Sequence, residues 1–178
     1  MRTHEKSRVG SRRASRSSLP IRELAVASML VVNCASGELV SPALGSCVCI
    51  AVYDPVAKIG GMLHAMLPDS ALDQDRASQR PQLFVDTGLP ALMQAVVAFG
   101  GEEKRLSVSV AGGAEFIGRN PNFNIGRRNI ESATAMLAHR GMKFRASCTG
   151  GHKSRKVRLD LNTGEITLET PGRKAVKL

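Results

Sequence analysis

The sequence predicts a single-domain α/β layered sandwich, with a mainly antiparallel or mixed β-sheet core and two main helices packed on it. At 178 residues the chain is long enough for one hydrophobic core and too short for two comfortable ones. Strand-like segments do not alternate with helical segments regularly enough for a doubly wound parallel sheet. Aromatic residues make up 3% of the chain, so aliphatic side chains, Ala and Met must fill the core.

The net charge of +10 is concentrated at the two ends of the chain. Residues 1–22 hold seven Lys and Arg against one Glu, and residues 140–178 hold ten against three acids. Residues 23–139 hold eight against eleven acids, so the central part is net negative. We expect residues 1–22 to be a disordered basic tail, because Arg and Ser offer little apolar surface to bury, and residues 23–178 to be the folded domain.

The charge and cysteine patterns argue against several functions. A nucleic-acid-binding module is disfavoured because the centre is acidic and stacking aromatics are nearly absent. The apolar run LAVASMLVV after a basic stretch resembles a secretory signal, but it is short and fits a buried strand, so we expect a cytoplasmic protein without membrane insertion. The four cysteines lack the spacing of a zinc site, and we expect reduced thiols with no metal or organic cofactor.

The secondary structure is predicted from apolar periodicity and turn residues. In the first half we expect a strand at 23–32, a turn at 33–39, a hairpin of 46–53 and 59–67 closed by DPVA, and an irregular loop at 68–85. In the second half we expect a helix at 86–99 capped by Asp86 or Thr87, a strand at 105–116, a helix at 124–141 and a second hairpin at 156–170.

The first hairpin brings a cysteine and a histidine together. If Tyr53 pairs with Lys58, Cys47 lies directly opposite His64, with about 5 Å between the Cβ atoms. A neighbouring imidazole can take the thiol proton and activate the sulfur as a nucleophile. The alternative is that Cys47, Cys49 and His64 are ordinary core residues, and Cys49 is assigned to the core in either case.

Five motifs resemble a known family in collinear order between about residues 24 and 170. They are LGSCVCIAVYDPVAKIGGMLHAMLP, FVDTGLPALM, GGAEF, NIGRRNIE and GGHKSRKVRLDLNTGEI. On these motifs the chain resembles the chemoreceptor glutamine deamidase family, CheD. The resemblance implies an enzyme of the protein-glutamine glutaminase type, which hydrolyses glutamine side-chain amides in methyl-accepting chemotaxis receptors to glutamate and ammonia.

The resemblance also implies a set of catalytic residues. Cys47 is the nucleophile, His64 is the general base and acid, and the intermediate is a thioester. The family places a threonine six positions before the cysteine, and this chain has Ser41 there. Ser41 keeps a hydroxyl that is expected to orient His64.

The partners implied by the resemblance are chemoreceptor cytoplasmic helices and a CheC-type phosphatase. Acidic receptor helices fit the basic run in the first half of the last motif, although the same residues also suit a solvated strand. Two alternatives stay open: a catalytically weak regulatory subunit that binds the phosphatase and, less favoured, a nucleic-acid-binding module. The basic run consists of Lys153, Arg155, Lys156 and Arg158.

Overall fold

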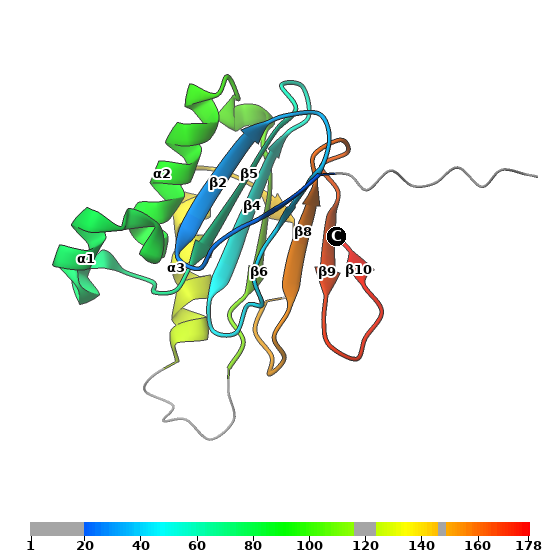
Figure 1. Ribbon diagram of the computed structural model, residues 1–178. Coiled ribbons are helices and arrows are strands. Elements are labelled where there is room, and N and C mark those ends of the chain that lie inside the picture. The colour runs from blue at the N-terminus through cyan, green and yellow to red at the C-terminus, as the bar shows by residue number, and fades with distance from the viewer. Residues whose placement is uncertain (1–19, 116–123, 146–148) are drawn as a thin grey trace, which may run out of the picture.

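In the computed structural model, which describes residues 20–115, 124–145 and 149–178, two five-stranded β-sheets pack together and helices cover one of them (Figure 1). The strand orders are β1-β3-β8-β9-β10 and β2-β5-β4-β6-β7, and only the pairs β1–β3 and β6–β7 are parallel. The predicted α/β layered sandwich is confirmed. The strands are β1 (Ile21–Glu23), β2 (Ser28–Asn33), β3 (Glu38–Val40), β4 (Val48–Asp54), β5 (Ile59–Ala65), β6 (Ser107–Gly112), β7 (Phe144–Arg145), β8 (Lys156–Asp160), β9 (Ile166–Glu169) and β10 (Val176–Lys177).

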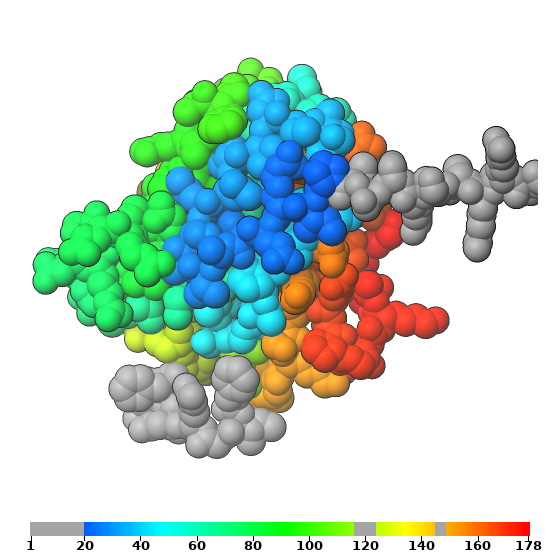
Figure 2. Space-filling model, viewed as in Figure 1, coloured from blue at the N-terminus to red at the C-terminus, as the bar shows by residue number. Residues whose placement is uncertain are grey.

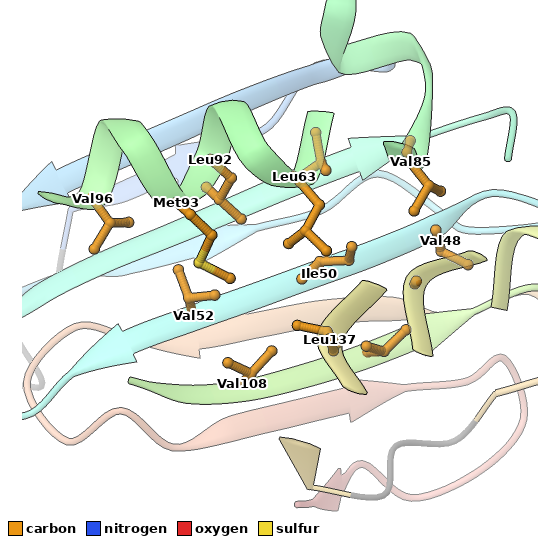
Figure 3. Close-up of a cluster of buried hydrophobic side chains, with 14 of the residues drawn as sticks. Val48, Ile50, Val52, Leu63, Val85, Leu92, Met93, Val96, Val108 and Leu137 are labelled. Carbon is orange, nitrogen blue, oxygen red and sulfur yellow. The ribbon is translucent and has the colours of Figure 1, made fainter. Parts of the chain in front are cut away.

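Two long helices pack against the outer face of the second sheet. They are α2 (Val85–Ala98) and α3 (Ile125–His139), close to the helices predicted from the sequence. Every second residue of β4 points toward them, and Figure 3 shows Ile50 and Val52 beneath Leu92 and Met93 of α2. Aliphatic burial of this kind contributes about 25 cal/mol per Å² of apolar surface. The helices therefore hold the central strands of this sheet in place.

The opposite face of the second sheet packs against the first sheet. Cys49, Ala51 and Tyr53 of β4 belong to this inter-sheet core, together with leucines and valines of β3, β8 and β9. The sheets approach so closely at Gly60 that a Cβ there would overlap the Leu161 side chain. Residues of β4 and β5 thus alternate between the helix layer and the inter-sheet core.

A buried carboxylate closes the β4–β5 hairpin. Asp54 is fully buried, and its side chain accepts hydrogen bonds from the N–H groups of Val56 and Ala57 at 2.9 and 3.0 Å. Arg105 pairs with the same carboxylate at 2.8 Å. A buried carboxylate that loses its cationic partner typically costs about 3–5 kcal/mol, so this contact fixes the loop firmly.

The register of this hairpin differs from the prediction. Asp54 pairs with Ile59, so Pro55 to Lys58 form the loop, and Lys58 adopts the left-handed conformation at φ 54°. The predicted pairing of Tyr53 with Lys58 is wrong, because the carboxylate of Asp54 holds the turn one residue further along. Each residue of β4 consequently lies opposite a β5 residue two positions later than expected.

Three other segments also differ from the prediction. Residues 23–32 form parts of two strands in different sheets, because the chain turns before Ala27, which has φ 51°. The predicted turn at 33–39 includes the start of β3. The predicted loop at 68–85 contains η1 (Ser70–Leu72), α1 (Gln74–Gln79) and η2 (Pro81–Leu83), with η3 (Glu103–Arg105) later in the chain.

Side-chain capping explains why short helices form in the segment that was predicted as a loop. Asp69 and Asp73 accept hydrogen bonds from the N–H groups that begin η1 and α1. The cap expected for α2 is wrong: its N-cap is Phe84, without a side-chain bond. Asp86 instead accepts from Ser70, and the Thr87 hydroxyl donates to the carbonyl of Pro81.

Parts of the predicted tail and motifs lie outside the described residues, namely 1–19, 116–123 and 146–148. Among the described residues, strand pairing begins at Ile21, which lies opposite Glu38, two residues before the start expected for the folded domain.

Candidate active site

Cys47 lies immediately before β4, where the two sheets meet. Its carbonyl accepts a hydrogen bond from the N–H of Gly113 at 2.8 Å, and Gly45 accepts one from Ala114 at 2.8 Å. Gly112 has φ 104°, and a Cβ there would overlap the Cys47 carbonyl oxygen. The glycines of the GGAEF motif therefore let β6 approach Cys47 closely.

His64 lies on β5 and is 1% exposed. Its Nδ1 accepts a hydrogen bond from the backbone N–H of Ala27 at 3.1 Å. Because a backbone N–H can only donate, the neutral ring carries its proton on Nε2. Burial lowers the pKa of His64 below its ordinary value, since the imidazolium would lose hydration.

Cys49, not Cys47, lies directly opposite His64. The predicted cross-strand pair of Cys47 with His64 is wrong by two residues, but a shift of two keeps the same face. Cys47 packs against the same inter-sheet core as Cys49. It is thus a diagonal neighbour of His64, at a spacing of about 7–8 Å in a regular antiparallel pair.

The two thiols have different environments. Cys49 is 1% exposed and burial strongly raises its pKa, whereas Cys47 is half-buried and burial raises its pKa less. The Cys47 thiol also lies near its own backbone N–H, which lowers the pKa and partly offsets burial. Burial therefore favours the neutral thiol of Cys47 and the neutral imidazole of His64 over the charged pair.

Ser41 is buried in the first sheet, next to β8. Its hydroxyl accepts a hydrogen bond from the N–H of Val157 at 2.9 Å and donates one to the carbonyl of Pro42 at 2.8 Å. These bonds tie the end of β3 to β8 and occupy the hydroxyl with backbone groups. An orienting contact with His64 stays a prediction.

Sequence reasoning missed Asn129, a buried polar residue of α3. It is fully buried, and its Nδ2 donates to the carbonyls of Ser46 and Met66, both at 2.9 Å. Asn129 shares the inward face of α3 with Ala133 and Leu137. A polar side chain on an otherwise apolar helical face was the available signal, because such a residue requires buried partners.

The basic run divides into residues that pair internally and residues that face solvent. Arg158 forms ion pairs with Glu38 and Glu169 at 2.9 and 2.6 Å. The guanidinium of Arg155 is mostly buried and donates to the carbonyls of Gly150 and Lys153. Lys153 and Lys156 are exposed and form no ion pair within the described part of the chain.

A basic groove of about 470 Å³ lies beside Lys153. The segments that line it, near residues 150 and 173, meet at the lower right of Figure 2 as orange and red surfaces. Thr149 bridges to Gly112, which pairs with Val48, so the groove begins about two strand spacings, or about 10 Å, from the start of β4. Its cationic or titratable lining residues are His152, Lys153, Arg155, Arg173 and Lys174.

Within residues 20–115, 124–145 and 149–178, no three His, Cys, Asp or Glu side chains are grouped so that they would hold a metal ion. Within the same ranges, no helix has the length and apolar character needed to cross a bilayer.

Comparison with known proteins places the chain in a family. The family model described as CheD chemotactic sensory transduction matches residues 66–170, and a relative from Syntrophus aciditrophicus is 40% identical over 149 residues. The chain belongs to the CheD family. The alignment covers 84% of this chain and 93% of that relative, which is named probable chemoreceptor glutamine deamidase CheD 1.

Other CheD relatives match over a similar span. The chemoreceptor glutamine deamidase CheD of Thermotoga maritima is 37% identical over 136 residues, covering 76% of this chain and 83% of that protein. A probable chemoreceptor glutamine deamidase of Anaeromyxobacter dehalogenans is 41% identical over 132 residues, covering 74% and 83%. The family resemblance predicted from the five motifs is thus confirmed.

The neutral state of Cys47 predicts how it reacts with iodoacetamide. Its alkylation rate should rise with pH and reach half its maximum above the ordinary thiol pKa of about 8.5, because burial opposes the thiolate. Cys34 provides an internal control, since its half-buried thiol has a pKa lowered by hydrogen bonds to Ser36 and should react at lower pH. Peptide mass spectrometry measures both rates, and a Cys47 rate that stays high in acid would contradict the neutral pair.

The buried bonds of Ser41 predict a cost in stability. Ser41→Ala leaves the N–H of Val157 without its acceptor and should lower the free energy of unfolding by about 1–3 kcal/mol. Ser41→Thr keeps the hydroxyl and should cost less. Urea unfolding measures both changes, and equal stability of Ser41→Ala and wild type would show that the Val157 bond contributes little.

Proposed function

We propose that this protein is a chemoreceptor glutamine deamidase that converts specific glutamine side chains to glutamate, with Cys47 as the nucleophile. The names of its relatives support the substrate class. The observation that carries the choice of Cys47 is its position: it lies at the open end of β4, on the face that carries buried His64, whereas Cys49 is enclosed.

The reaction follows from a thiol and an imidazole on one face. The Cys47 sulfur bonds to the amide carbon of the glutamine while His64 takes the thiol proton. His64 then passes this proton to the leaving nitrogen, the C–N bond breaks, and ammonia and a thioester remain. A water deprotonated by His64 attacks the thioester, and the proton returns to the departing Cys47 sulfur, leaving glutamate.

The contact between Ala27 and His64 constrains the proton transfers. An imidazolium carries a proton on both ring nitrogens, but the N–H of Ala27 points at Nδ1. The first step therefore requires the Ala27 amide to move away from Nδ1 when substrate binds. Ala27 has φ 51°, a conformation that costs an L-residue roughly 1–2 kcal/mol, so leaving it is favourable for this residue alone.

Ser41 is proposed to orient His64 in the substrate-bound state. In the free protein its hydroxyl bonds to Val157 and Pro42, so this role requires an exchange of hydrogen bonds. The Ser41→Ala variant separates the two roles: a change in the NMR titration of His64 supports orientation, and a change in stability alone supports a structural role.

The basic groove is proposed to receive acidic parts of the receptor helices. Lys153, Arg173 and Lys174 line it and form no ion pairs with other described residues, so their charge is available to a partner. This replaces the four-residue basic run predicted from the sequence, because Arg155 and Arg158 are committed within the fold. We further propose that the protein acts in the cytoplasm and docks to a CheC-type phosphatase.

Deamidation is tested with purified chemoreceptor cytoplasmic fragments. The wild-type protein should convert specific glutamines to glutamates, detected as the corresponding mass change by peptide mass spectrometry. Cys47→Ala should reduce the rate by at least about 10³-fold, and His64→Ala by at least about 10²-fold. Cys49→Ala is the matched control, since it removes the thiol directly opposite His64, and should keep near-wild-type turnover.

The outcomes separate the alternatives. Loss of activity in Cys49→Ala but not in Cys47→Ala would reassign the nucleophile. Absence of deamidation by the wild-type protein on several receptors would favour the catalytically weak regulatory subunit.

Charge reversal tests the groove. The double variant Lys153→Glu with Lys174→Glu should raise KM for the receptor fragment about 10-fold with little change in kcat, and make KM less sensitive to NaCl. Lys104→Glu is the control, because this exposed lysine lies in η3 at the opposite end of β6. Equal KM values for the groove variant and the control would show that the groove does not contribute to receptor binding.

A further inference from the structure

Asn129 connects the chain beside Cys47 with the chain beside His64. One Nδ2 atom donates to Ser46, the residue before Cys47, and to Met66, two residues after His64, each at 2.9 Å. The side chain comes from α3, so a helix outside both sheets ties the two strand ends together. The contact fixes backbone atoms that directly adjoin the candidate nucleophile.

The hydrogen bond to Ser46 sets the direction of the Cys47 N–H. The peptide between them is trans, as are all described peptides, so its C=O and N–H point in opposite directions. The C=O points to Asn129, and the Cys47 N–H therefore points away from α3. No other described residue accepts a hydrogen bond from this N–H, and the Cys47 sulfur itself lies near it. It is a donor held in place beside the candidate nucleophile.

The side-chain oxygen of Asn129, Oδ1, is buried but has no hydrogen-bond partner among the described residues. A flipped amide would not relieve this, because Oδ1 would then face two carbonyl oxygens. An unpaired buried polar atom costs about 1–3 kcal/mol, and an aliphatic residue would remove that cost only by leaving the carbonyls of Ser46 and Met66 without this donor. The contribution of Asn129 thus lies in its two Nδ2 bonds rather than in packing.

We propose that Asn129 is a positioning residue that aims the Cys47 N–H at the oxyanion formed during glutamine hydrolysis. This inference rests on the proposed function. When the Cys47 sulfur attacks the amide carbon, the carbonyl oxygen gains the negative charge, and the N–H of Cys47 donates to it. When the C–N bond breaks, the carbonyl re-forms and the charge disappears. Such preorganised donors stabilise the transition state because they need no reorganisation.

Substitutions of Asn129 test this with the receptor-fragment assay. Asn129→Leu and Asn129→Asp both remove the donors and should lower kcat about 10²-fold, with KM within about twofold of wild type. Asn124→Ala is the matched control, because it removes the N-cap of the same helix and destabilises α3 without touching Ser46. A kcat loss in the Asn129 variants no greater than in Asn124→Ala would overturn the inference.

Alkylation distinguishes a loss of the direction of the Cys47 N–H from a displacement of the whole Cys47 residue. Iodoacetamide reacts with Cys47 by direct displacement, which forms no oxyanion, so its rate should stay at the wild-type value in the Asn129 variants. A parallel loss of alkylation and turnover would show that Asn129 only holds Cys47 in place.

A measurement on the wild-type protein covers the case in which the variants do not fold. A receptor peptide with an aldehyde in place of the glutamine amide should form a hemithioacetal with Cys47, and the amide proton of Cys47 should shift downfield in ¹⁵N–¹H spectra. An adduct without this shift would overturn the role of the Cys47 N–H. Failure to form any adduct would instead contradict Cys47 as the nucleophile of the proposed function.

Discussion

The buried carboxylate of Asp54 is the contact on which the candidate site depends. It accepts hydrogen bonds from two loop N–H groups and from the N–H of Glu102, and Arg105 holds its pKa well below the usual range. These contacts fix the turn between β4 and β5, and the turn fixes every pairing along the hairpin. A slip of one residue would move His64 from the inter-sheet core to the helix layer. The carboxylate of Asp54 at one end of the hairpin thus determines on which face of the sheet His64 lies at the other end.

Sequence patterns predicted the fold well where interactions between residues close in the sequence determine the structure. The two long helices and both hairpins follow from apolar spacing and turn residues, and the face shared by Cys47 and His64 was predicted because side chains alternate along a strand. The register was wrong because the sequence does not reveal that Asp54 accepts bonds from the loop. The segment at 68–85 was predicted as a loop because its capping aspartates also suit an irregular chain.

The remaining parts of the candidate site depend on contacts between residues far apart in the sequence. Asn129 bonds to Ser46 and Met66 across three elements, and the amide of Ala27 reaches His64 from the turn before β2. No spacing rule links such residues, since each contact exists only after the layers have packed. Ser41 illustrates the converse: a family motif identifies the position, but the packed structure decides which groups its hydroxyl meets.

The amide of Ala27 has a further consequence for the chemical durability of the protein. Peroxides oxidise thiolates far faster than thiols, and oxidation past the sulfenic acid destroys a cysteine nucleophile. If Cys47 is the nucleophile and His64 its base, as proposed, the Cys47 thiol should resist oxidants between encounters with substrate, because the N–H of Ala27 occupies Nδ1 of His64. The half-buried Cys34, whose thiolate is favoured by Ser36, should react with oxidants before Cys47 and Cys49 do. In the proposed mechanism, the hydrogen bond from Ala27 to His64 that delays proton transfer would thereby also protect the nucleophile.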